Sequence, residues 1–198
     1  MSFTGKLIAI SGAASGIGLA TARLLAQRGA LLSLSGGNGE ALDKAKQAWI
    51  YKTTAGLGPL HGAANAARVG RKSAITDPLD SLMNALRAQG NHVSSEGASI
   101  VNVTNLAGVT AVPFAGVAYT ASEHGVRNIR VNCVPPGTIS TPPLEKAVKQ
   151  GNIHMEQISA LRRLGTAEDT AYVIAFLLSQ ESPFVTGSTY NVDERYIY

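Results

Sequence analysis

The sequence predicts an α/β fold in which a doubly wound parallel sheet forms a single domain over residues 1–198. Three observations carry this prediction. Short apolar segments alternate with segments of helical periodicity. A glycine-rich turn joins the first apolar segment to the first helical one. The chain is 45% hydrophobic and 15% charged, which suits one packed domain and excludes a disordered chain.

The first strand–helix–strand unit occupies the start of the chain. Residues 6–10 form an apolar run that is typical of a strand buried on both faces. Apolar residues then recur at helical spacing over residues 17–28, and Gly29 ends that helix. Residues 30–34 form a second apolar strand, which a turn rich in glycine and asparagine follows. Two parallel strands joined in this way predict a right-handed crossover.

The rest of the chain continues this alternation. Helices are expected at residues 40–55, 78–88 and 167–179. Strands are expected at residues 60–66, 98–104, 129–134 and 189–192. Between the second strand and residue 60 there is room for one helix only, so a third strand at the sheet edge is expected to be absent.

Composition excludes several classes of protein. A single cysteine, Cys133, cannot build a disulfide framework and indicates a reducing compartment, so we expect a cytoplasmic protein. No His, Cys, Asp or Glu residues have the spacing of metal ligands, so no metal site is expected. The net charge of +4 is scattered along the chain, which favours solubility over nucleic-acid binding. No apolar run approaches the ~20 residues that a membrane helix needs.

The glycine-rich turn after the first strand carries the clearest functional signal. Gly12 allows a tight turn, Gly16 lets the backbone approach a pyrophosphate, and Gly18 lets helix and strand pack closely. The helix that begins here offers free N–H groups and the positive end of its dipole to a phosphate. The position of the turn within a strand–helix–strand unit therefore predicts a Rossmann-like dinucleotide-binding site.

The spacing Gly-x-x-x-Gly-x-Gly resembles the signature of the short-chain dehydrogenase/reductase family. Further segments that resemble the family run along nearly the whole chain: Asn65-Ala66-Ala67, Ile100-Val101-Asn102-Val103, Leu106-Ala107-Gly108, Tyr119-Thr120-Ala121-Ser122, Arg130-Val131-Asn132, Pro136-Gly137-Thr138-Ile139, Arg163-Leu164-Gly165 and Val185-Thr186-Gly187. The resemblance implies an NAD(P)-dependent oxidoreductase that acts on a carbonyl or secondary alcohol of a small-molecule substrate.

The resemblance also implies a cofactor site. Its expected members are Gly12, Ser15, Gly16, Ile17, Gly18, Asn65, Pro136, Gly137 and Thr141. At the end of the second strand, residues 35–38 (Ser-Gly-Gly-Asn) contain no acid that would repel a 2′-phosphate, which weakly favours NADP(H) over NAD(H). The family usually assembles through helices of which part is missing here, and a homo-oligomer stays an open expectation.

The expected active site departs from the family pattern. Tyr119 matches the family's proton-transferring tyrosine, but the lysine four residues on is Glu123, and the serine that binds the substrate oxygen is Asn105. A carboxylate one helical turn away disfavours the phenolate, so Tyr119 is expected to donate a proton rather than to abstract one. Asn105 can still donate a hydrogen bond to the substrate oxygen. Carbonyl reduction is therefore favoured over alcohol oxidation.

Other interpretations stay open. Tyr119 and Glu123 could form the acid–base pair of a non-redox isomerase or cyclase, or the chain could be an inactive cofactor-binding scaffold. Arg68 replaces a family glycine and could occlude the cofactor ribose, supply the lost cation or face solvent. The chain is also several dozen residues shorter than usual members through internal losses, which fits either a shortened variant or an incomplete sequence.

Overall fold

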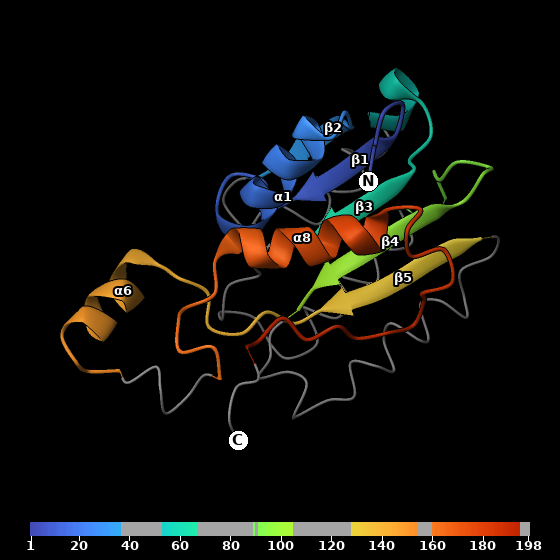
Figure 1. Ribbon diagram of the computed structural model, residues 1–198. Coiled ribbons are helices and arrows are strands. Elements are labelled where there is room, and N and C mark those ends of the chain that lie inside the picture. The colour runs from blue at the N-terminus through green and yellow to red at the C-terminus, as the bar shows by residue number, and fades with distance from the viewer. Residues whose placement is uncertain (37–52, 67–88, 90, 105–127, 154–159, 195–198) are drawn as a thin grey trace, which may run out of the picture.

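The described part of the chain forms one parallel sheet. A computed structural model describes residues 1–36, 53–66, 89, 91–104, 128–153 and 160–194. Its elements are β1 (Leu7–Ser11), α1 (Gly16–Gln27), β2 (Leu31–Ser35), β3 (Gly62–Asn65), β4 (Ala98–Val103), β5 (Ile129–Val134), α6 (Pro142–Lys149) and α8 (Ala167–Leu178). The five strands pair in parallel in the order β2-β1-β3-β4-β5 (Figure 1). This arrangement confirms the predicted α/β class.

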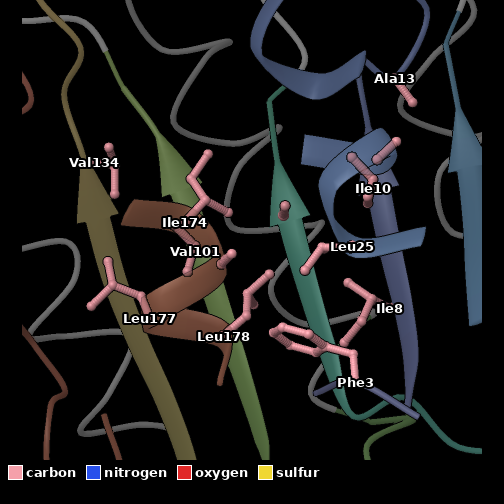
Figure 2. Close-up of a cluster of buried hydrophobic side chains, with 13 residues drawn as sticks. Phe3, Ile8, Ile10, Ala13, Leu25, Val101, Val134, Ile174, Leu177 and Leu178 are labelled. Carbon is pink, nitrogen blue, oxygen red and sulfur yellow. The ribbon is translucent and has the colours of Figure 1, made fainter. Parts of the chain in front are cut away.

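Helices α1 and α8 lie side by side on one face of the sheet (Figure 1). Their apolar residues face the strands because apolar positions recur at helical spacing. Leu25 of α1 and Ile174 and Leu177 of α8 are fully buried against Ile8 and Ile10 of β1 and their neighbours (Figure 2). Burying each such side chain contributes about 1.5–3 kcal/mol, so this cluster is the main core of the described fold.

Both ends of α8 are held by polar side chains. At its start, Thr166 Oγ1 accepts a hydrogen bond from Asp169 N (3.1 Å), and Asp169 Oδ2 accepts one from Thr166 N (2.7 Å). This capping box satisfies two backbone donors that the first helical turn leaves unpaired. At the other end, Arg130 of β5 donates to Ser179 O (3.0 Å), where a cation also suits the negative end of the helix dipole.

The opposite face of the sheet has its own apolar cluster. Because side chains alternate along a strand, Ala9, Ala63, Ile100 and Val131 form one register row across β1, β3, β4 and β5 on this second face. All four are buried, and Leu7 packs with them. The sheet is therefore apolar on both faces, as the continuous apolar runs in the sequence indicate.

The structure departs from the sequence predictions in two places. Helix α6 (Pro142–Lys149) is absent from the sequence predictions. Leu144, Ala147 and Val148 have helical spacing and are its half-buried residues, but the segment is only eight residues long and buries no side chain fully. Residues 189–192 form no full strand; only Thr189 and Val192 make isolated parallel bridges beside β5. Within the described residues β2 is an edge strand, and residues 37–52, where a third strand would follow, lie outside them.

Residues 53–57 are helical, as predicted for the end of the segment that begins at residue 40. The helix predicted at residues 78–88 lies outside the described residues. The other predicted elements match the observed ones to within about two residues at each end.

Candidate cofactor and substrate site

The turn after β1 has the backbone geometry that its glycines predict. Gly12 and Gly16 have φ values of +72° and +51°, which glycine adopts without strain. A Cβ atom added to Gly18 would lie 2.3 Å from the carbonyl oxygen of Gly12. The first turn of α1 thus packs directly on the end of β1, and only hydrogen at position 18 permits that contact.

The N-terminus of α1 is open to a ligand within the described structure. Ser15 precedes the helix in an extended conformation (φ −158°, ψ 171°), and its side chain makes no capping hydrogen bond. The first helical turn contains no acidic residue. Ala14, Ser15 and Gly16 are exposed. The N–H groups of this turn have no acceptor within the helix, so they are available to an anionic group such as a pyrophosphate.

The end of β2 lies against this turn and leaves no space for a side chain. Ala13 N donates to Ser35 O (3.0 Å). A Cβ atom added to Gly36 would lie 2.9 Å from Ala14 Cβ and 3.0 Å from Ala14 N. An acidic residue at position 36 would therefore require the turn to shift.

Polar side chains occupy one register row at the carboxyl end of the sheet. Ser11, Asn65, Asn102 and Cys133 are register partners from β1 through β5, two residues beyond the apolar row on the same face. Asn65 Nδ2 donates to Asn102 Oδ1 (2.8 Å), and Gln89 joins the pair through Asn65. The carboxyl ends of parallel strands are where ligands bind in open α/β sheets, and here that edge is polar.

The segment after β5 is held by the C-terminal part of the chain. Gly137 N donates to Val192 O (2.9 Å), and Pro136 forms a parallel bridge with Val192. A Cβ atom added to Gly137 would lie 2.6 Å from Asp193 Cα. Thr141 precedes α6 and is exposed. Pro136 and Gly137 are thus fixed beside the sheet edge, while Thr141 begins an exposed helix.

A cleft of about 360 Å³ adjoins this segment, between Thr138 and Ile139 on one side and the start of α8 on the other. Arg163 and Asp169 both line the cleft, and Arg163 donates two hydrogen bonds to Asp169, of 2.6 and 3.0 Å. The hydrogen bonds from Arg163 hold the pKa of Asp169 well below its usual range, and the Thr166 backbone N–H adds to this effect. Both charges of the pair are therefore present at neutral pH.

Cys133 is fully buried at the end of β5. Burial raises the pKa of its thiol to about 11, although the neighbouring Asn102 amide offsets part of that rise. A thiol of this kind is protonated at neutral pH and is not a nucleophile. Within the described residues, no three His, Cys, Asp or Glu side chains form a group able to hold a metal ion.

The three predicted catalytic residues, Tyr119, Asn105 and Glu123, lie outside the described residues, as does Arg68. The predicted cofactor residues all lie inside them. The turn residues come together at the start of α1, while Asn65 and the segment at Pro136 and Gly137 lie at the same sheet edge. No helix of the described chain is long and apolar enough to cross a membrane.

Gln89 belongs to this polar cluster, but its own sequence context does not predict that it is buried. A glutamine followed by Gly90 and Asn91 has the composition of an exposed turn. In the structure it is 2% exposed. The available signal was Asn102, because a polar residue within an apolar strand requires a buried hydrogen-bond partner.

Comparisons with known proteins agree with this geometry. A family model described as enoyl-(acyl carrier protein) reductase matches residues 50–196. Short-chain dehydrogenase/reductase aba4 of Botryotinia fuckeliana is 34% identical over 250 residues, covering 96% of this chain and 96% of that protein. A 3-oxoacyl-(acyl-carrier-protein) reductase of Thermotoga maritima is 31% identical over 242 residues, covering 98% of each.

The fold is also found among solved structures. A short-chain type dehydrogenase/reductase from Mycobacterium ulcerans superposes with a TM-score of 0.82 at 23% identity, covering 98% of this chain and 90% of that one. The sequence alignments run over more than 240 residues although this chain has 198, while covering nearly all of both proteins. Dozens of residues present in these relatives are therefore missing from the interior of this chain.

Proposed function

Because the chain belongs to the short-chain dehydrogenase/reductase family and is an NAD(P)-dependent oxidoreductase, we propose that it reduces a carbonyl group of a small-molecule substrate with NADPH. The open helix N-terminus after Gly12 is the observation that carries this proposal. Within the described residues, the first turn of α1 has no side-chain cap and contains no acidic residue, and Gly18 keeps the helix close to the strand end. These features fit a pyrophosphate.

The cofactor site extends from this turn along the carboxyl edge of the sheet. The residues assigned to it are Gly12, Ser15, Gly16, Ile17, Gly18, Asn65, Pro136, Gly137 and Thr141. When bound there, the nicotinamide supplies the hydride. The polar row and the open α1 terminus support this placement, because both face the edge at which α/β sheets bind nucleotides.

The chemistry at the substrate is assigned to three residues. Asn105 donates a hydrogen bond to the carbonyl oxygen and polarises it. Tyr119 donates its phenolic proton to that oxygen as the hydride arrives. The carboxylate of Glu123 disfavours the phenolate and so keeps the proton on Tyr119. Reduction is therefore the favoured direction.

NADP(H) is the preferred cofactor in this proposal. An acid at the end of β2 would bind the ribose hydroxyls of NAD(H) and repel a 2′-phosphate. Ser35 and Gly36 supply none, and the contact of Gly36 with Ala14 leaves no space for one. Titration with NADPH and NADH, followed by cofactor fluorescence, should give a lower Kd for NADPH than for NADH.

We further propose that the protein works in the cytoplasm as a homo-oligomer and as one domain over residues 1–198. The single cysteine, Cys133, supports a reducing compartment. The exposed large hydrophobic side chains of the described structure include two aromatic ones: Phe184 is 101% exposed and Tyr172 is 55% exposed. Aromatic side chains of this kind are enriched in protein interfaces. Light scattering on a size-exclusion column measures the assembly directly.

The rate of NADPH oxidation distinguishes carbonyl reduction from the two alternative functions, a non-redox enzyme and an inactive scaffold. NADPH oxidation is measured across a panel of ketones and aldehydes for the wild type and for Glu123→Lys combined with Asn105→Ser. The double variant should turn over faster, because it restores a cation beside Tyr119 and a hydroxyl at the substrate oxygen. Cofactor binding without oxidation in either protein would favour a non-redox enzyme, and absence of binding would leave a scaffold.

A further inference from the structure

Gln89 and Asn65 exchange two hydrogen bonds at the carboxyl end of β3. Asn65 Nδ2 donates to Gln89 Oε1 (3.2 Å), and Gln89 Nε2 donates back to Asn65 Oδ1 (2.8 Å). The second hydrogen of Asn65 Nδ2 goes to Asn102, as described above. Gln89 and Asn102 are 2% and 1% exposed. Both amide hydrogens of Asn65 are thus used inside the protein, and its side chain has no donor left for a ligand.

A backbone hydrogen bond beside Asn65 connects β3 to the end of β1, from which the phosphate-binding turn begins. Ser11 is the register partner of Asn65, and Ala66 N donates to Ser11 O (3.2 Å). Ser11 is the residue directly before Gly12, at which the chain turns into α1. A displacement of Asn65 therefore moves the strand end from which the turn begins. Small displacements matter here because a binding site needs its groups within about 0.5 Å of the productive geometry.

We propose that Gln89 is a positioning residue of the cofactor site. It holds the Asn65 amide in one orientation, and Asn65 in turn fixes the ends of β3 and β1 on which the pyrophosphate-binding turn is built. The role of Asn65 toward the cofactor is then indirect, through its backbone and the strand end, rather than through its side-chain amide. This inference rests on the proposed function, because it presupposes that NADP(H) binds at the turn.

Gln89→Glu tests this role by replacing a single nitrogen with oxygen. The introduced carboxylate keeps an oxygen that accepts from Asn65 Nδ2 but, when ionised, loses the donor to Asn65 Oδ1 and places two acceptor oxygens face to face. A protonated carboxyl regains a donor, so lowering the pH rescues the contact within the same protein. Burial favours the protonated form of the introduced carboxyl, so the defect grows as the pH rises.

Binding of NADP⁺ is measured by isothermal titration calorimetry at several pH values between about 5.5 and 8.5, and the Kd of the variant is divided by that of the wild type. Titration of the 2′-phosphate cancels in this ratio. We expect the ratio to be roughly 10 at the highest pH and to fall below about 2 at the lowest, because an unpaired buried acceptor carries a cost of that size. Thermal unfolding of the cofactor-free protein should show the same pH trend.

Asn132→Asp is the matched control. Asn132 is also a fully buried amide on a strand, and it donates to Val185 O (3.0 Å) and accepts from Ser188 N (3.1 Å), away from the Asn65 cluster. Its replacement removes one buried donor in the same way. The melting temperature of Asn132→Asp should fall with rising pH, while its Kd for NADP⁺ stays within about twofold of the wild type.

The outcomes separate the two proposals. If the wild type binds NADP⁺ and Gln89→Glu binds it equally well at high pH, Gln89 has only a structural role and the inference is overturned. A Kd ratio that does not change with pH overturns it too, because the donor was then not the cause. If the wild type binds neither NADP⁺ nor NAD⁺, the proposed function itself fails and the assignment of Gln89 fails with it.

Discussion

The carbonyl oxygen of Gly12 lies where a side chain on Gly18 would begin: a Cβ atom at position 18 would be 2.3 Å from it. The two residues are six apart in sequence: Gly12 directly follows β1, and Gly18 lies in the first turn of α1. Their contact brings the start of the helix onto the end of the strand. The exposed backbone donors of α1 are presented at the sheet edge as a consequence.

Gly18→Ala should weaken cofactor binding and lower stability. The added methyl group cannot fit without moving the turn, which costs about 1–3 kcal/mol of the free energy of unfolding. The Kd for NADPH should rise by at least about tenfold. Calorimetric titration and thermal unfolding measure the two effects. Gly56→Ala is the control, because a Cβ there meets no other described atom within 4 Å beyond its own chain neighbours and helix backbone. The same Kd for both variants would contradict the prediction.

Asp169→Asn should destabilise the start of α8. The change weakens the capping box with Thr166 and removes the ion pair with Arg163. A lost cap costs about 1 kcal/mol, which lowers the melting temperature by roughly 2–4 °C in a chain of this size. Glu168→Gln, in the same helical turn but exposed, is the control for the helix dipole.

The effect of Asp169→Asn should also depend on pH. The pKa of Asp169 is depressed in the folded state, so its contribution is complete above the ordinary aspartate pKa of about 4 and is lost as the pH falls further. The difference in melting temperature between wild type and variant should therefore be constant near neutrality and shrink in acid. A difference that grew in acid would refute this account.

Protonation of His61 should lower the free energy of unfolding in mildly acidic solution. Leu7 N donates to His61 Nδ1 (3.1 Å), which requires that nitrogen to be unprotonated. Burial lowers the pKa of His61, and Lys6 lowers it further, while Glu96 opposes them. The folded state thus favours neutral imidazole, so stability is complete above the ordinary histidine pKa of about 6.5 and falls as the pH drops below it.

His61→Asn tests this statement, because the Asn oxygen can accept the same hydrogen bond at every pH. Denaturant unfolding at pH 8 and at about pH 5 should show a smaller loss of stability for the variant than for the wild type. Equal losses in the two proteins would show that other groups cause the acid sensitivity.

Cys133 should resist thiol reagents in the folded protein. Its side chain is fully buried and its pKa is raised to about 11. Near neutral pH the reagent therefore cannot reach the sulfur, and the sulfur is not in the reactive thiolate form. Reaction with Ellman's reagent at pH 8 should be slower than in denaturant by several orders of magnitude. Rapid labelling of the native protein would mean that the end of β5 opens readily.

Much of the fold and part of the site follow from local patterns in the sequence. A continuous apolar run identifies β1, because a strand buried on both faces needs apolar side chains at nearly every position. β4 and β5 are identified from shorter apolar stretches that polar residues interrupt. The periodic apolar residues and the glycine after them identify α1. The spacing of Gly12, Gly16 and Gly18 identifies the phosphate-binding turn. Each of these positions needs glycine for a local reason, either a positive φ or a close backbone contact a few residues away.

Other features depend on contacts between distant parts of the chain. Gln89 has the sequence context of a surface turn, yet its pairing with Asn65 buries it at the sheet edge. Gly137 is required because Asp193, far along the chain, packs against it. Local sequence determined the strands, the first helix and the cofactor turn, because their signals come from neighbouring residues. Only the tertiary structure decided which polar side chains meet at the sheet edge, because hydrogen-bond partners are chosen by proximity in space.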